Sequence, residues 1–190
     1  MDEPSDLQLI QDALRGNSRA FDLLVLRYQD RLVHSLQHGL CGREEALDAA
    51  QAAFLQAWMR LSTFRGESGF YGWLYRIARN AAITRRRKTP PTGSLDQLHE
   101  HSGFEPSNQN PHSAPEDFLE RGEEVQRVRR ALQQLPDEFR QPLVLREIDG
   151  MSYEEIGSIL DIPLGTVRSR IFRARQELLE KLERDEQSQR

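Results

Sequence analysis

Two clusters of basic side chains have the type and spacing needed to bind a polyanion. The first lies between residues 68 and 95, where no acidic residue occurs, and it holds Arg76, Arg79, Arg85, Arg86, Arg87 and Lys88. The second lies between residues 166 and 176, also without an acidic residue, and it holds Arg168, Arg170, Arg173 and Arg175. Because guanidinium groups fork onto phosphates and onto the edge of guanine, the clusters favour nucleic acid as the partner. A solvated helix face is the alternative for either cluster alone.

The net charge of −4 at pH 7 does not exclude such a partner. The acidic residues gather elsewhere, mainly at 44–48 and 116–124. Screening limits the reach of a charge to about 8–10 Å, so a local patch matters more to a polyanion than the sum over the chain.

The second cluster follows a pattern typical of a helix-turn-helix. Ser152 and Glu155 predict a capping box at the start of a helix that ends near residues 161–165. Gly165 suits the tight turn, and Thr166 is expected to cap the helix that follows.

This second helix, near residues 166–178, should be amphipathic. The face expected to pack consists of Val167, Ile171, Ala174 and Leu178. The face free to enter a major groove consists of Arg168, Ser169, Phe172 and Arg173. A helical hairpin used for protein contact is the alternative, although four arginines without an acid are unusual on a protein-facing surface.

The helix before this pair should begin at residues 135–138 and end at 149–150. Pro142 lies inside that stretch, so the helix is expected either to kink or to begin later. Arg146, near its end, could reach the DNA backbone.

Five aromatic residues between Phe64 and Asn80 lie beside Arg76 and Arg79. Aromatic platforms flanked by cations bind single-stranded DNA, at about 1–3 kcal/mol for each stacked base. The alternative is that Phe70 and the neighbouring apolar residues of the same stripe only form core.

The elements that must position these residues are all helical. Apolar residues recur at helical spacing in the stretches 18–39, 47–61 and 70–84, after a short helix that Ser5 and Gln8 are expected to cap. Residues 89–115 carry five of the nine prolines and no apolar period, so they are predicted to be a linker. The sequence therefore predicts an all-α protein of two small helical domains.

Other features narrow the class of protein. No run of apolar residues is long enough to span a membrane, and the acidic N-terminus lacks a signal core, so a cytoplasmic protein without membrane insertion is expected. Cys41 is the single cysteine, which fits a reducing compartment. His34, His38 and Cys41 could be metal ligands, but apolar neighbours surround them and no fourth ligand is near. No phosphate loop, nucleophile elbow or paired carboxylates occur, so we expect no catalytic residue, metal or cofactor.

Two long motifs resemble a known family. Residues 64–66 and 73–80 resemble region 2 of extracytoplasmic-function sigma factors of the sigma-70 family, and residues 145–156 and 165–175 resemble region 4. The similarity extends over nearly the whole chain outside the linker, and it is greatest to the envelope-stress, sigma-E-like subgroup.

The resemblance implies a role for each matching residue. The residues that would hold the opened −10 strand are Phe64, Ser68, Gly69, Phe70, Trp73, Arg76, Arg79 and Asn80. The residues that would contact the −35 duplex are Arg146, Thr166, Arg168, Ser169, Phe172 and Arg173. Arg85–Lys88 would hold phosphates. The residues that would bind the clamp helices of core RNA polymerase are Asp48, Gln51 and Leu55. Ala52 and Thr84 stand where the family commonly has acidic residues.

The resemblance also implies the organisation and the partners. Residues 1–88 would form sigma region 2, residues 89–115 a flexible linker and residues 116–190 sigma region 4. The 27 linker residues can extend to about 90 Å, and promoter elements two helical turns apart are separated by roughly 70 Å. Expected partners are core RNA polymerase, promoter DNA and an anti-sigma factor. The alternative is a stand-alone helix-turn-helix regulator, which would leave the aromatic stretch without a role.

Overall fold

The computed structural model describes residues 3–66, 69–88 and 115–188, and these contain α-helices and one 3-10 turn but no strand. The elements of the first half are α1 (Asp6–Leu14), α2 (Ser18–Gly39), α3 (Arg43–Met59), η1 (Leu61–Thr63) and α4 (Phe70–Lys88). Those of the second half are α5 (Pro115–Gln133), α6 (Asp137–Glu147), α7 (Tyr153–Leu160) and α8 (Leu164–Ser188). The predicted all-α class is confirmed.

The first half is a helical bundle whose core follows the predicted stripes. α3 packs on α4 and on α2, and α1 covers α2. Leu24, Leu32, Leu36 and Leu74 are fully buried where these helices meet. Ser5 and Gln8 form the expected capping box of α1.

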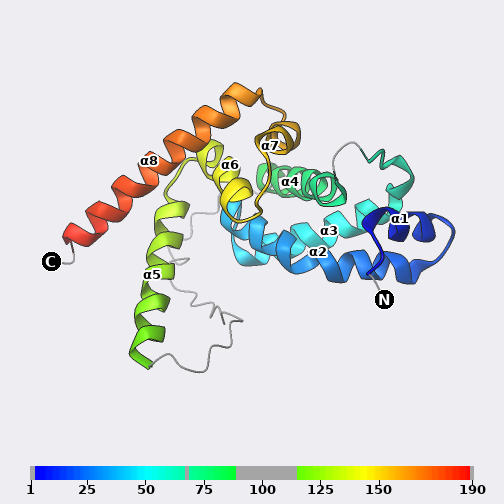
Figure 1. Cartoon of the computed structure of the whole chain (residues 1–190), viewed down its shortest axis with the longest axis horizontal. Coiled ribbons are helices and arrows are strands. Elements are labelled where there is room, and N and C mark those ends of the chain that lie inside the picture. Colours follow the sequence, from blue (N-terminus) through cyan, green and yellow to red (C-terminus); the bar gives the residue numbers. More distant parts are fainter. Residues whose placement is uncertain (1–2, 67–68, 89–114, 189–190) are drawn as a thin grey trace.

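The second half is built around α8, which packs on α6, α7 and α5. The capping box of α7 forms as predicted, with the Ser152 hydroxyl accepting from the Glu155 amide and the Glu155 carboxylate accepting from the Ser152 amide. Toward its C-terminus α8 extends away from the rest of the molecule (Figure 1).

The turn between α7 and α8 differs from the prediction. Asp161 adopts the left-handed conformation, with φ 56° and ψ 52°, and makes the tight turn that Gly165 was expected to make. An aspartate tolerates this conformation because its short side chain is polar. α8 therefore begins two residues before Thr166, whose amide donates to the Pro163 carbonyl inside the first turn.

Two prolines also lie differently from what was predicted. α6 begins at Asp137 and continues through Pro142, whose side chain is fully buried. Pro115 is the first residue of α5, a position where the missing amide proton removes no helical hydrogen bond. Residues 89–114 of the predicted linker lie outside the described residues.

The two halves pack against each other. α6 lies against α2, and α7 lies against α4 (Figure 1). Val144 of α6 reaches the first half beside Gly39 and Tyr75. This contact decides which of the predicted binding residues are accessible.

Candidate nucleic-acid interface

α8 presents the predicted reading face to the outside. Val167, Ile171 and Ala174 are buried against the neighbouring helices. The opposite face is exposed, and it consists of Arg168, Ser169, Phe172 and Arg173. Phe172 is 61% exposed, which is unusual for a phenylalanine in a small domain. A major groove admits a helix, and this face offers it two cations around an apolar ring.

The four arginines in the first half of α8 divide into two pairs. Arg170 forms an ion pair with Glu138 at 3.1 Å, and Arg175 forms one with Glu147 at 2.5 Å. Among the described residues, the side chains of Arg168 and Arg173 have no such partner. The first pair therefore fastens α8 to α6, whereas the second pair is available to a ligand.

Arg146 and Thr166 are the other two residues predicted to contact the −35 duplex. The Arg146 guanidinium donates to the Met151 carbonyl at 2.7 Å and lies 5.1 Å from the centre of the Tyr153 ring. It therefore supports the turn before α7 from inside. Thr166 is half-buried, and its carbonyl accepts from the Ser169 hydroxyl.

An aromatic cluster marks the start of α4. Phe64 lies 5.4 Å from Trp73 and 6.0 Å from Phe70, as measured between ring centres. Phe70 is buried, whereas Phe64 and Trp73 are half-exposed, so only the latter two offer a surface to a base. Gly69 is exposed directly before α4, and Ser68 lies outside the described residues.

The cations of α4 are occupied by the second half of the chain. Arg76 donates to the carbonyl of Ser158 at 2.7 Å and to its hydroxyl at 2.9 Å. The Nε of Arg79 donates to the side-chain oxygen of Gln141 at 2.8 Å. Asn80 is exposed beside a shallow groove between α3 and α4. The structure therefore places Phe70, Trp73, Arg76, Arg79 and Asn80 on α4, with Phe64 and Gly69 before it, and engages Arg76 and Arg79 in bonds to the second half.

Farther along α4, the remaining cations are paired in part. Arg85 forms an ion pair with Asp48 of α3 at 2.6 Å, and Arg86 forms one with Asp137 of α6 at 2.8 Å. Thr84 and Ala52 line the groove between α3 and α4. The side chains of Arg87 and Lys88 lie outside the described residues.

The predicted polymerase-binding residues share one exposed face of α3. Asp48, Gln51 and Leu55 are spaced by three and four positions, and Leu55 is 62% exposed. The ion pair of Asp48 with Arg85 joins this face to α4.

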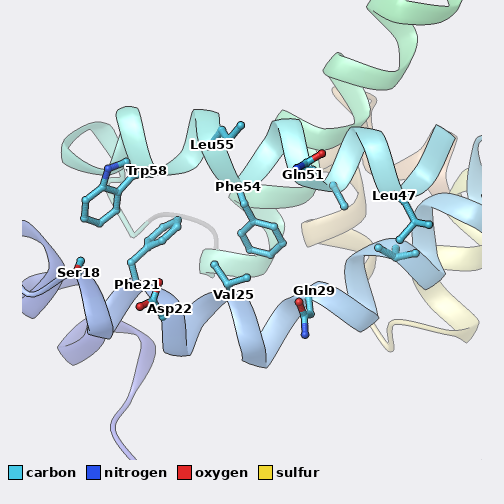
Figure 2. A pocket seen from close by; sticks show the side chains of 12 residues that line it. Ser18, Phe21, Asp22, Val25, Gln29, Leu47, Gln51, Phe54, Leu55 and Trp58 are labelled. Carbon is cyan, nitrogen blue, oxygen red and sulfur yellow. The ribbon is translucent and has the colours of Figure 1, made fainter. Parts of the chain in front are cut away.

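A groove of about 500 Å³ runs beside that face between α2 and α3 (Figure 2). Phe54 and Val25 point toward each other across it, and Trp58 lies 5.0 Å from Phe21 at one end. The full lining is Ser18, Phe21, Asp22, Val25, Gln29, Val33, Leu47, Ala50, Gln51, Phe54, Leu55 and Trp58.

Sequence reasoning missed part of this groove. Leu47 and Trp58 belong to the apolar stripe at 47–61, but their side chains are 48% and 43% exposed. The sequence did contain an indication of the groove, because α3 also carries Leu55 and Met59 outside the apolar stripe. A helix with apolar residues on more than one face needs a second partner.

Histidines near the end of α2 lie at the contact with the second half. His34 and His38 make an edge-to-face contact, with their ring centres 4.4 Å apart. Burial, the neighbouring His34 and Arg129 lower the pKa of His38 to about 4. Burial also raises the pKa of the Cys41 thiol to about 11. These groups are thus neutral near pH 7.

Comparison with known proteins decides the family. The model of sigma-70 region 2 matches residues 24–90, and the model of sigma-70 region 4 matches residues 125–178. The chain belongs to the sigma-70 family. Its relatives place this sigma factor in the extracytoplasmic-function group.

The similar proteins match over nearly their whole length. The RNA polymerase sigma-H factor of Pseudomonas aeruginosa is 42% identical over 178 residues, covering 92% of both chains. The ECF RNA polymerase sigma-E factor of Escherichia coli K12 is 41% identical over 183 residues, covering 94% of this chain and 95% of the other.

Two solved structures resemble this sigma factor. CnrH in complex with the cytosolic domain of CnrY superposes with a TM-score of 0.69 at 27% identity, covering 96% of this chain and 99% of that one. The sigma factor RpoE of Bartonella quintana, solved with the anti-sigma factor NepR, superposes with a TM-score of 0.65 at 25% identity, covering 86% and 96%. In the part of the chain that the structure describes, no helix is long and apolar enough to cross a bilayer.

Proposed function

We propose that this sigma factor divides its work among three surfaces: α3 binds core RNA polymerase, α4 holds the opened −10 strand and α8 reads the −35 duplex. As an alternative sigma factor, the protein binds the core enzyme, recognises promoter DNA and directs transcription initiation. The bond-forming chemistry belongs to the polymerase, and this chain contributes binding. Its place of action is the cytoplasm.

The observation that carries the −35 assignment is the division of the arginines on α8. Arg168 and Arg173 flank the exposed Phe172, whereas Arg170 and Arg175 are paired with α6. Base edges are read by side chains that are free to turn toward them, and backbone contacts then fix the register. A stand-alone regulator would use this face as well, but it would not need sigma region 2.

The −10 assignment is supported by the half-exposed rings of Phe64 and Trp73 on or beside the helix that carries Arg76, Arg79 and Asn80. Rings stack on bases, and cations follow the phosphates. Phe70 supports this cluster as a buried residue. Gly69, together with Ser68 outside the described residues, would form the loop of the base pocket.

The clamp-binding assignment rests on the exposed face of α3 and the groove beside it. Apolar surface of this extent marks a docking site for another protein. An anti-sigma factor is the second partner that we propose, because the Bartonella relative was solved with one. In this arrangement residues 1–88 act as region 2, residues 89–115 as the linker and residues 116–190 as region 4.

Run-off transcription with core polymerase tests the proposal. Wild-type protein should direct transcription from one promoter class, and Phe64→Ala and Asn80→Ala should fail on duplex promoters. A template with a pre-opened bubble should restore both variants, because melting is then no longer required. Lack of restoration would show that these residues do not act in melting.

A further inference from the structure

The contact between the two halves engages hydrogen-bond donors of two residues that the −10 strand would need. Arg76 and Arg79 are bonded to Ser158 of α7 and Gln141 of α6. Arg79 is half-buried, and Gln141 is 6% exposed, so the Nε of Arg79 can bond to a phosphate only after Gln141 has moved away. In this closed arrangement of the two halves, donors that a strand phosphate would use are therefore engaged within the chain.

A buried carboxylate holds this closed arrangement. The side chain of Asp149, which follows α6, is 1% exposed. The Ser35 hydroxyl lies 2.7 Å from each of its oxygens, the Tyr71 hydroxyl 3.1 Å from one, and the Nε of Arg31 3.2 Å from the same one. Arg31 also donates to the Asp149 carbonyl at 2.8 Å.

All these partners belong to the other half of the chain. Ser35 and Arg31 lie on α2, and Tyr71 lies on α4. The Arg31 guanidinium also lies 3.8 Å from the centre of the Tyr71 ring. A buried carboxylate is stable only when its hydrogen bonds are made, and here they exist only while the halves are together.

A second tyrosine opposes the closed arrangement. Tyr75 is fully buried, and its hydroxyl has no hydrogen-bond partner among the described residues. The Tyr75 hydroxyl and the Val144 side chain each lie 3.5 Å from the position that a Cβ on Gly39 would take. Val144 belongs to α6, so separation of the halves gives the Tyr75 hydroxyl access to water. A buried hydroxyl without a hydrogen-bond partner costs free energy, and hydration removes this cost.

We propose that the free protein is autoinhibited in this closed form, with Asp149 as the latch and the buried hydroxyl of Tyr75 as a built-in bias toward opening. The inhibitory effect rests on the proposed function of Arg76 and Arg79 at the −10 strand. Opening is then a required step before the strand binds.

The same atom removed from two tyrosines of α4 should have opposite effects. Tyr71→Phe removes a bond to the latch and should raise the open fraction on the order of tenfold. Tyr75→Phe removes the unsatisfied hydroxyl and should lower the open fraction by a similar factor. Tyr28→Phe is the matched control, because the Tyr28 hydroxyl bonds to Asp6 within the first half.

Two readouts on the full chain measure the open fraction. Cys41 is the single cysteine, is half-buried, and has Arg140 and Asp137 of α6 as neighbours, so its rate of alkylation by a maleimide should follow opening. Affinity for a single-stranded −10 oligonucleotide should change by the same factor, because binding to a minor state is reduced by its population. Asp149→Asn should shift both readouts in the direction of Tyr71→Phe.

Equal alkylation rates in wild type, Tyr71→Phe and Asp149→Asn would overturn the latch, and faster alkylation of Tyr75→Phe would overturn the role of its hydroxyl. Run-off transcription separates the two proposals. Shifted alkylation rates in variants that never direct transcription would leave the latch standing and refute the proposed function. Normal transcription by variants whose alkylation rates equal that of the wild type would refute the latch and support the proposed function.

Discussion

At the scale of single residues, the arginines of α8 show how one residue type serves two purposes on one helix. Arg170 and Arg175 face acidic residues of α6 and fasten the helix. Arg168 and Arg173 lie on the exposed face with Phe172. The position on the helix, and not the charge itself, therefore separates an arginine that supports the fold from one that can read DNA.

This division predicts different effects for two alanine substitutions on α8. Arg173→Ala should relax the choice of −35 sequence, reducing the preference at one base pair by about tenfold, because a forked contact with guanine is lost. Arg170→Ala, the matched control, should remove one surface ion pair with Glu138 and leave the preference unchanged. Run-off transcription over promoters that vary in the −35 element measures both. An equal loss of preference in the two variants would contradict the assignment.

Much of this residue-level division was visible in the sequence. The spacing of Val167, Ile171 and Ala174 predicted the buried side of α8, and the structure confirms it. The ion pairs of Arg170 and Arg175 could not be predicted, because their partners lie about thirty residues away on α6. Periodicity describes which face is buried but not which charges meet.

At the scale of elements, α3 is the helix whose sequence was hardest to interpret. It is buried against α2 and α4, yet it also presents Leu55 and Trp58 to the groove (Figure 2). A stripe of apolar residues predicts burial, but it does not say whether the covering partner belongs to the same chain. The apolar stripe at 47–61 therefore did not show that Leu47 and Trp58 line an open groove.

The groove predicts a substitution that separates binding from folding. Leu55→Asp should weaken the binding of core polymerase on the order of tenfold, because an apolar contact is replaced by a charge. The fold should stay intact, since Leu55 is 62% exposed. Leu26→Asp is the matched control, because Leu26 is 65% exposed on α2 and does not line the groove. Equal affinities of the two variants in a polymerase pull-down would refute the docking site.

At the scale of the whole molecule, the contact between the halves is the feature that the sequence did not predict. Its bonds join Arg31 to Asp149, Arg76 to Ser158 and Arg79 to Gln141, which are 62 to 118 residues apart. The prediction of two helical domains is confirmed, but no local pattern indicates that they close on each other. Arg76 and Arg79, which are expected to meet phosphates, make hydrogen bonds within the chain in this structure.

The histidine pair near this contact predicts a dependence of stability on pH. The pKa of His38 is about 4 in the folded protein, whereas the ordinary pKa of a histidine side chain is 6.5. Between these values the unfolded chain binds a proton that the folded chain does not, so the free energy of unfolding falls as the pH is lowered from 6.5 toward 4. His34, Arg129 and Asp149 are the charged or titratable groups that act on the pair.

His38→Gln should make this dependence weaker. We expect the loss of stability between about pH 7 and about pH 5 to shrink by roughly 1 kcal/mol, a value reduced to allow for partial exposure. Urea denaturation at the two pH values measures it, and the difference between variant and wild type cancels the titration of other groups. Parallel pH profiles would show that His38 does not contribute.

Arg76 and Arg79 meet uncharged oxygens in the closed protein, namely those of Ser158 and Gln141. A DNA phosphate in the same place carries a full negative charge and a condensed layer of counterions. When DNA replaces these oxygens, counterions are released to the solution, so the exchange becomes less favourable as the salt concentration rises. High salt therefore favours the closed chain, and low salt favours binding of the promoter strand.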